Sequence, residues 1–294
     1  MELKGVYTAM VTPFREDRID EAGLVQNIRS QLAAGISGLV FLGTTGESST
    51  LTDEEQKKVI EIGVQETKGK AAVIIGTGSY STRQTVEKTR RAKEMGAEVA
   101  LIVTPYYNKP TQEGIYRHFE AISSNVDLPI LVYNIQGRTG VNIETPTLLR
   151  IASLPNVIGV KEASGNIVQI GEVLLSVRKK FPSFVVLSGD DGLTLPIMVL
   201  GATGVISVVS NLVPERVVSL VDAALKGRFH EARQIHEELS PLFKLAFIEV
   251  NPTPIKYAMD LCGMAAGPCR LPLCEMRRES QEILAAKLRE MGLV

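Results

Sequence analysis

The sequence predicts an α/β protein: a (β/α)8 TIM barrel with a C-terminal helical extension. Eight short apolar runs rich in β-branched residues recur between Val6 and Val208. Most of them are continuously apolar rather than alternating, which is typical of parallel strands covered on both faces. Amphipathic stretches separate the runs, and this strand–helix alternation predicts a barrel. A doubly wound open sheet is the alternative arrangement.

Each expected element has a local signal. The strands are expected at residues 6–11, 38–42, 71–75, 99–103, 130–133, 157–160, 184–187 and 204–208. Thr52 and Glu55 have the spacing of a capping box, so a helix should begin there. Three further helix starts are expected at Ser81-Thr82, at Thr111 and at Thr145-Pro146.

The strand pattern stops at Pro214, and residues 217–225, 229–246, 254–262 and 279–290 are expected to be helical. The first of these helices would complete the barrel. No low-complexity linker precedes the others. We therefore expect a barrel of residues 1–224 that carries the active site, and a helical annex of residues 225–294 that is not an independent domain.

The composition favours a small-molecule partner. The chain of 294 residues has 22% charged residues and a net charge of −1, which offers no electrostatic footprint for nucleic acid or a membrane surface. The three cysteines, Cys262, Cys269 and Cys274, fit no zinc spacing and are expected to be free thiols, although their role stays open. Without a secretory signal or an apolar run of about 20 residues, we expect a cytoplasmic protein.

Lys161 is the principal catalytic candidate. Active sites of such barrels lie at the C-terminal ends of the strands, and Lys161 directly follows the apolar run 157–160. Apolar surroundings should lower the pKa of its amine and free it to attack a carbonyl. The alternative is a structural lysine paired with Glu162 or Asp190.

Residues at neighbouring strand ends support a reaction of the Lys161 amine with a carbonyl compound. The hydroxyl of Tyr133 could move protons, unless the ring only packs in the core. The loop Gly43-Thr44-Thr45-Gly46 offers N–H groups and hydroxyls to a carboxylate, or else forms a simple turn. Arg138 could bind a second carboxylate, or form a surface ion pair. Together they describe a site for a 2-oxo acid and a second acidic substrate.

Two other classes of function remain open. A divalent metal held by Asp190, Asp191 and Glu47 would give a metal-dependent enzyme, although no nucleotide-loop, zinc-protease or nucleophile-elbow motif occurs in the sequence. A barrel that only binds a ligand would instead be expected to lose Lys161 or Tyr133, and both are present.

Several long motifs resemble the dihydrodipicolinate synthase family of pyruvate-dependent class I aldolases. They are Gly43-Thr44-Thr45-Gly46-Glu47, Thr104-Pro105-Tyr106-Tyr107-Asn108, Tyr133-Asn134, Arg138-Thr139-Gly140, Gly159-Val160-Lys161-Glu162 and Ser188-Gly189-Asp190-Asp191. The resemblance extends to Arg270-Leu271-Pro272-Leu273 and so covers nearly the whole chain.

The resemblance implies a role for each residue. Lys161 would form a Schiff base with pyruvate, so that covalent pyruvate replaces any cofactor, and Thr45 would hold the pyruvate carboxylate. Tyr133, Thr44 and a neighbouring subunit's Tyr107 would relay protons. Arg138 would bind the carboxylate of L-aspartate 4-semialdehyde, and the pyruvate pocket would be lined by Gly189 and Ile206. The product would be 4-hydroxy-tetrahydrodipicolinate, made by a homotetramer built as a dimer of dimers.

Two further expectations concern specificity and regulation. Thr45 and Arg138 favour the synthase over a sialic acid lyase, and a sugar-acid aldolase is the runner-up because it shares the Schiff-base machinery. Members inhibited by lysine carry particular polar residues and histidines around the dimer cleft. Here the matching positions are Asp53, Gln56, Tyr80 and Gln84, so we expect no feedback inhibition by lysine.

Overall fold

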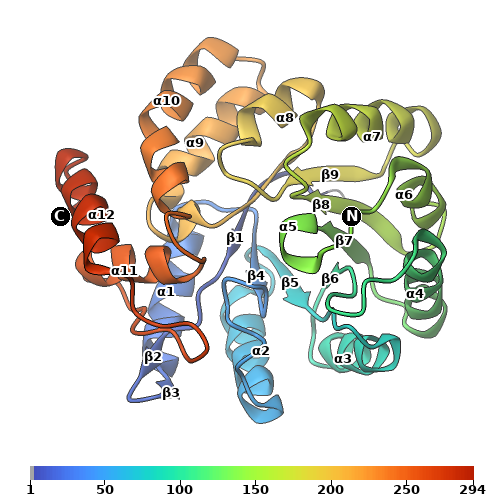
Figure 1. The fold of residues 1–294 in the computed structure, drawn as a ribbon, viewed down its shortest axis with the longest axis horizontal. Coiled ribbons are helices and arrows are strands. Elements are labelled where there is room, and N and C mark those ends of the chain that lie inside the picture. The colour runs from blue at the N-terminus through green and yellow to red at the C-terminus, as the bar shows by residue number, and fades with distance from the viewer. Residues whose placement is uncertain (1–2) are drawn as a thin grey trace.

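The computed structural model describes residues 3–294 and contains the predicted barrel. Eight parallel strands close in the order β1-β10-β9-β8-β7-β6-β5-β4. The strands lie at the centre of Figure 1, with helices around them. They are β1 (Gly5–Ala9), β4 (Gly38–Phe41), β5 (Ala72–Gly76), β6 (Val99–Val103), β7 (Ile130–Asn134), β8 (Val157–Glu162), β9 (Val185–Ser188) and β10 (Gly204–Ser207). The closed barrel excludes the open-sheet alternative.

Helices surround the strands. They are α1 (Glu21–Ala33), α2 (Asp53–Thr67), α3 (Thr82–Glu94), α4 (Gln112–Asn125), α6 (Thr145–Ile151), α7 (Ile167–Lys180), α8 (Thr194–Leu200) and α9 (Pro214–Leu225). The capping box of Thr52 and Glu55 is present at the start of α2. At α6 the N-cap is Glu144 rather than Thr145, so Thr145-Pro146 begins the helix one residue earlier than predicted.

Three smaller elements have no counterpart in the predicted pattern. A hairpin of β2 (Phe14–Arg15) and β3 (Arg18–Ile19) follows the first strand. A single turn, α5 (Gln136–Thr139), follows β7 and carries Arg138, and a 3-10 turn, η1 (Val209–Asn211), follows β10. These elements are too short to produce a helical or alternating pattern in the sequence.

The annex consists of α10 (Phe229–Leu245), α11 (Thr253–Leu261) and α12 (Arg278–Glu290). It lies along one side of the barrel in Figure 1, where α10 packs on α9 and α12 packs on α11. The segment between α10 and α11 reaches the mouth of the barrel, because Val250 and Asn251 line the cavity there. The annex therefore contributes residues to the cavity at the mouth of the barrel.

Two apolar clusters hold the fold together. The larger fills the space between the strands and the helices, and the smaller fills the barrel interior with side chains that include Tyr7, Val40, Leu131, Leu187 and Ile206. A filled interior is typical of this barrel, and it closes the space below the site. Polar side chains that point inward at the C-terminal ends of the strands consequently lie directly above these packed apolar side chains.

Candidate active site

Lys161 occupies the upper end of the barrel interior. It lies near the end of β8, where it is paired in register with Tyr133 of the neighbouring strand β7. Its side chain is buried, and its Nζ lies 4.2 Å from the centre of the Tyr133 ring. The predicted pair is therefore assembled by the register of two neighbouring strands.

Burial activates the Lys161 amine. It lowers the pKa of the amine from 10.5 to about 7, while the nearby Asp191 charge acts in the opposite direction and the Arg138 charge adds to the decrease. A substantial fraction of the side chain is therefore neutral at pH 7. A neutral amine is the form that attacks a carbonyl carbon.

Tyr133 stays protonated across the physiological pH range. Burial raises the pKa of its hydroxyl to about 12, although the Arg138 charge and the Thr44 hydroxyl oppose the increase. A protonated hydroxyl both donates and accepts hydrogen bonds, so it can pass a proton without becoming a persistent phenolate.

The Lys161 side chain needs a glycine at position 189. A Cβ atom there would lie 3.0 Å from both Cγ and Cε of Lys161 and 2.8 Å from Cβ of Ala163. Any larger residue would displace the lysine. Ile206, the other residue expected to line the pyruvate pocket, belongs to the apolar cluster inside the barrel.

The threonine loop follows β4 and is held tightly. Thr12 Oγ1 donates to the carbonyl oxygen of Gly46 at 2.7 Å, and a Cβ on Gly46 would lie 3.1 Å from the carbonyl oxygen of Met10. Thr44 faces the cavity, and Thr45 is buried with its Oγ1 3.0 Å from Asn251 Nδ2. The loop therefore presents two hydroxyls from a fixed backbone.

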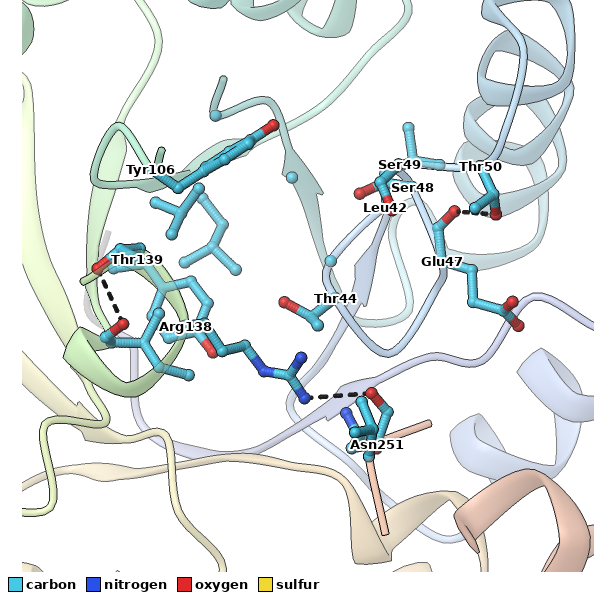
Figure 2. A pocket seen from close by; sticks show the side chains of 18 of the residues that line it. Leu42, Thr44, Glu47, Ser48, Ser49, Thr50, Tyr106, Arg138, Thr139 and Asn251 are labelled. Carbon is cyan, nitrogen blue, oxygen red and sulfur yellow. Dashed lines mark hydrogen bonds between the residues drawn. The ribbon is translucent and has the colours of Figure 1, made fainter. Parts of the chain in front are cut away.

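Arg138 reaches the same space from α5. Figure 2 shows its guanidinium and the Thr44 side chain extending toward one another, with Asn251 beside the guanidinium. Arg138 Nη2 donates to the carbonyl oxygen of Asn251 at 3.1 Å. The remaining N–H groups of the fork are available to a carboxylate.

Two adjoining cavities lie between these residues. The inner cavity, of about 40 Å³, is lined by Lys161, Gly189 and Thr45, and the outer one, of about 270 Å³, opens over Ser48, Tyr106 and Val250. Thr44, Tyr133, Arg138 and Asn251 line both. This arrangement suits a small carbonyl compound at the lysine and a second molecule entering from outside.

Tyr107 does not lie with the other predicted residues. Its side chain is 91% exposed and its backbone has a φ of 71°, a conformation that is uncommon outside glycine. Of the three residues expected to relay protons, Tyr133 and Thr44 line both cavities, and Tyr107 lines neither. The adjacent Tyr106 lines the outer cavity and packs edge-on against Tyr80.

The three carboxylates considered as metal ligands do not converge. Glu47 accepts from Lys256, Asp190 accepts from the backbone of Gly192 and Leu193, and Asp191 accepts from Val208 and Val209. No group of His, Cys, Asp and Glu within residues 3–294 is arranged to hold a metal ion. The geometry does not support the metal-site alternative.

Sequence reasoning missed the annex residues at the site. Asn251 contacts Thr45 and Arg138, yet it stands far from both in the chain. The only signal was the run Asn251-Pro252-Thr253-Pro254, in which Pro252 precedes α11 and Pro254 lies in its first turn. Such a turn does not reveal which part of the barrel it touches.

Comparison with known proteins identifies the family. The profile of the dihydrodipicolinate synthetase family matches residues 2–291. This chain belongs to that family. The 4-hydroxy-tetrahydrodipicolinate synthase of Protochlamydia amoebophila is 56% identical to it, over 99% of this chain and 97% of that protein.

Solved structures of dihydrodipicolinate synthases have the same fold. The enzyme from Thermotoga maritima superposes with a TM-score of 0.98 at 42% identity and covers both chains fully. A structure described as the first monomeric dihydrodipicolinate synthase variant has a TM-score of 0.97 at 42% identity, over 99% of this chain and 97% of that one. The predicted family and barrel are thus confirmed, and neither the sugar-acid aldolase nor the purely binding barrel is favoured.

Proposed function

We propose that this member of the dihydrodipicolinate synthetase family condenses pyruvate with L-aspartate 4-semialdehyde to give 4-hydroxy-tetrahydrodipicolinate. This is the first committed step of diaminopimelate and lysine biosynthesis. The observation that carries the proposal is the buried Lys161, whose amine has a pKa of about 7, between Tyr133 and the threonine loop. Full-length relatives named as this synthase support the same reaction.

The first half of the reaction forms an enamine. The Lys161 amine attacks the ketone carbon of pyruvate, and loss of one water gives the protonated imine. Thr45 and its loop would hold the pyruvate carboxylate. A proton then leaves the pyruvate methyl group. Tyr133 and Thr44 would move protons during these steps, and the protonated state of Tyr133 and its position in the inner cavity support this role.

The second half joins the two substrates. The enamine carbon attacks the aldehyde carbon of aspartate semialdehyde, whose carboxylate would be bound by Arg138 in the outer cavity. The amine of that substrate then attacks the imine carbon, which closes the ring and releases the Lys161 amine. The net reaction releases one water, and we propose that it needs no cofactor beyond the covalent pyruvate.

We further propose a homotetramer, arranged as a dimer of dimers, in which a neighbouring subunit supplies Tyr107. The exposure of Tyr107 supports one interface near the cavity. Val168 and Leu175 of α7 and Val199 and Leu200 of α8 are 42–74% exposed, and this apolar face supports a second interface. Sedimentation analysis would test the assembly.

We propose a cytoplasmic location as well. The three cysteines are free thiols, which suits a reducing compartment. Within residues 3–294 no helix has the length and apolar character required to span a bilayer.

Borohydride trapping tests the Schiff base. Protein incubated with pyruvate and borohydride should gain the mass of one reduced pyruvyl group at Lys161. Lys161→Ala should show no gain, whereas Lys226→Ala, at an exposed lysine directly after α9, should be labelled like the wild type. An unlabelled wild-type protein would refute the mechanism.

Steady-state turnover tests the second substrate. Aspartate semialdehyde should be consumed with pyruvate, whereas sialic acid and keto-deoxy sugar acids should not be cleaved. Cleavage of a sugar acid at a higher kcat/KM would assign the chain to the runner-up activity.

A further inference from the structure

One residue of the annex contacts both groups that are proposed to bind carboxylates. Asn251 is buried, and its Nδ2 lies 3.0 Å from Thr45 Oγ1. Its backbone oxygen lies 3.1 Å from Arg138 Nη2. Asn251 also lines both cavities, so it stands where the site of the first substrate adjoins that of the second.

The bond to Thr45 fixes the direction of the hydroxyl. The Asn251 amide nitrogen can only donate, so Thr45 Oγ1 is the acceptor in this contact. The hydroxyl proton of Thr45 is then left for another acceptor. A carboxylate in the inner cavity is such an acceptor, because an ionised carboxylate accepts hydrogen bonds only.

The bond to Arg138 acts in a similar way. The carbonyl oxygen of Asn251 takes one N–H of the guanidinium and so restricts a long side chain that would otherwise sample many rotamers. A guanidinium held at one corner keeps its other donors in a fixed orientation.

The other end of the Asn251 amide indicates that stability alone does not explain this residue. Its Oδ1 is buried and has no hydrogen-bond partner among the residues that the structure describes. A buried polar atom without a partner destabilises the folded state. The side-chain oxygen of Asn251 has no partner, whereas its nitrogen donates to Thr45 Oγ1. We therefore attribute the asparagine at this position to its hydrogen bond with Thr45 rather than to a gain in stability.

We propose that Asn251 is a positioning residue that couples the two carboxylate sites. Through its side chain it presents the Thr45 hydroxyl to the pyruvate carboxylate, and through its backbone it fixes Arg138 for the carboxylate of the second substrate. This inference rests on the proposed function and adds a residue to it from outside the barrel.

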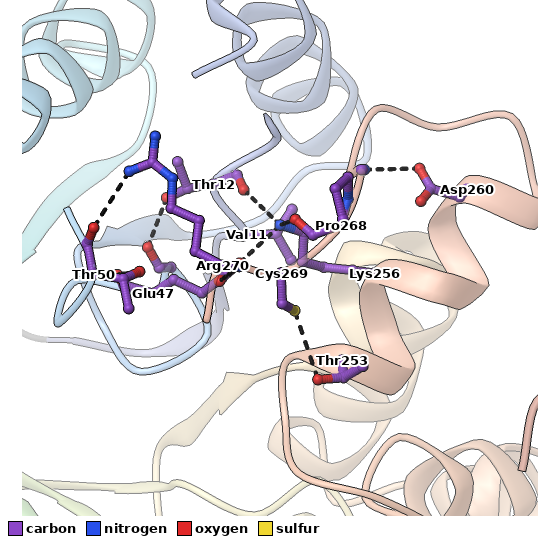
Figure 3. A network of polar contacts seen from close by, with 12 residues as sticks. Val11, Thr12, Glu47, Thr50, Thr253, Lys256, Asp260, Pro268, Cys269 and Arg270 are labelled. Carbon is purple, nitrogen blue, oxygen red and sulfur yellow. Dashed lines mark hydrogen bonds and ion pairs between the residues drawn. The ribbon is translucent and has the colours of Figure 1, made fainter. Parts of the chain in front are cut away.

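A second contact holds the annex and the loop at a fixed separation. Figure 3 shows Lys256 of α11 pointing at Glu47, the residue that ends the threonine loop. Lys256 Nζ lies 2.8 Å from Glu47 Oε1 and 3.1 Å from the carbonyl oxygen of Thr12, and Glu47 Oε2 accepts from the backbone nitrogen of Arg270 at 2.9 Å. Because both the loop and the annex are fixed, Asn251 can orient Thr45 with little freedom.

The test measures the dependence of borohydride trapping on pyruvate concentration. In Asn251→Leu, which removes the donor at similar volume, the half-saturating pyruvate concentration should rise about tenfold, the typical effect of one hydrogen bond to a charged group. The KM for aspartate semialdehyde should change less than about twofold, because the backbone oxygen that holds Arg138 remains. A merely structural defect would not separate the two substrates in this way.

A second variant reverses the hydrogen bond. Asn251→Asp has nearly the same shape but accepts from the Thr45 hydroxyl, so its half-saturating concentration should rise further than in Asn251→Leu. Asn125→Leu, at an exposed asparagine that ends α4, is the matched control and should bind pyruvate like the wild type. Urea unfolding of each variant reports whether it folds. If Asn251→Leu does not fold, the pyruvate saturation of Asn251→Asp tests the inference instead.

A double-mutant cycle tests the route through Thr45. Once Thr45→Val has removed the hydroxyl, adding Asn251→Leu should raise the half-saturating concentration no further. Folded Asn251 variants with wild-type pyruvate saturation, or losses that multiply in the double variant, would overturn the inference. A wild-type protein that pyruvate does not label is a different result, because it would overturn the proposed function itself.

Discussion

The Lys161 amine lies over the face of the Tyr133 ring, with Nζ 4.2 Å from the ring centre. The two residues are paired across β7 and β8, so the contact is set by backbone register rather than by flexible loops. Groups placed on strands keep their geometry more precisely than groups on loops. The proposed nucleophile and proton donor are therefore arranged before any substrate binds.

We expect imine formation to depend on pH with a midpoint near 7. Burial lowers the pKa of Lys161 to about 7, so the reactive neutral amine is scarce below that pH and dominant above it. The initial rate of borohydride trapping at subsaturating pyruvate should rise about tenfold per pH unit well below the midpoint and level off above it. A midpoint near 10 would show that the amine is not desolvated in the free enzyme.

The same burial should make Lys161→Met more stable than the wild type, most of all at low pH. Because the pKa falls from 10.5 in the unfolded chain to about 7 in the folded one, only the unfolded chain binds the proton between these values, and the wild-type stability rises with pH across this window. The buried Lys161 amine therefore lowers the free energy of unfolding of the wild type by roughly 5 kcal/mol at most below pH 7, and by roughly 2 kcal/mol at pH 9.

Urea unfolding at pH 6 and pH 9, at a fixed protein concentration, measures this difference. The advantage of Lys161→Met over the wild type should shrink as the pH rises. Lys226→Met, at an exposed ion pair with Asp222, serves as the control and should show little effect at either pH. An advantage that is constant or grows with pH would contradict the proposed desolvation.

The sequence was sufficient to predict the barrel and the residues at its strand ends. Continuous apolar runs mark buried parallel strands, and a residue that ends or follows such a run lies at the mouth. Lys161, Tyr133 and the threonine loop all follow from this rule. Arg138 was identified as well, although the helical turn α5 that presents it is too short to give a periodic signal.

The contacts of the annex could not be predicted in the same way. Asn251 and Thr45 are 206 residues apart, and Lys256 and Glu47 are 209 apart. Periodicity identifies the face of a helix that is buried, but not the surface against which it packs. Tyr107 shows a second limit, because a residue that would act in a neighbouring subunit has no partner within its own chain.

Mixed oligomers should reveal whether Tyr107 acts in a neighbouring subunit. Lys161→Ala and Tyr107→Phe should each have very low activity alone. If the tyrosine crosses the interface, a hybrid contains sites with Lys161 from one variant and Tyr107 from the other, and activity should reappear after mixing and reassembly. Mixtures of Lys161→Ala with Tyr133→Phe should recover less, because Lys161 and Tyr133 come from the same subunit. Equal recovery in both mixtures would argue against the proposed arrangement.

We expect L-lysine not to inhibit the enzyme. Gln56 donates to the carbonyl oxygens of Ser48 and Leu51, and the Gln84 side-chain oxygen accepts from Ser79, so both amides are engaged within the chain. Asp53, the one acidic residue among the four matching positions, lies 3.7 Å from Arg91. Calorimetry and turnover assays with added L-lysine should show neither binding nor inhibition at micromolar concentrations. Micromolar binding with matching inhibition would contradict this expectation and would show that the cleft around these four positions is an effector site.

The buried ion pair between Lys256 and Glu47 should be important for stability. Both side chains are at most 2% exposed, so removing one partner leaves a buried charge without its counter-ion. We expect Lys256→Met to lower the free energy of unfolding by about 3–5 kcal/mol. Lys226→Met, at an exposed pair with Asp222, should change it by less than about 1 kcal/mol.

Urea unfolding of the two variants provides this comparison. Because Glu47 ends the loop that carries Thr45, folded Lys256→Met should also bind pyruvate more weakly in the trapping assay. A stable Lys256→Met with unchanged pyruvate saturation would show that the threonine loop keeps its position without the Lys256 contact. Asn251 alone would then have to account for any coupling between the loop and the annex.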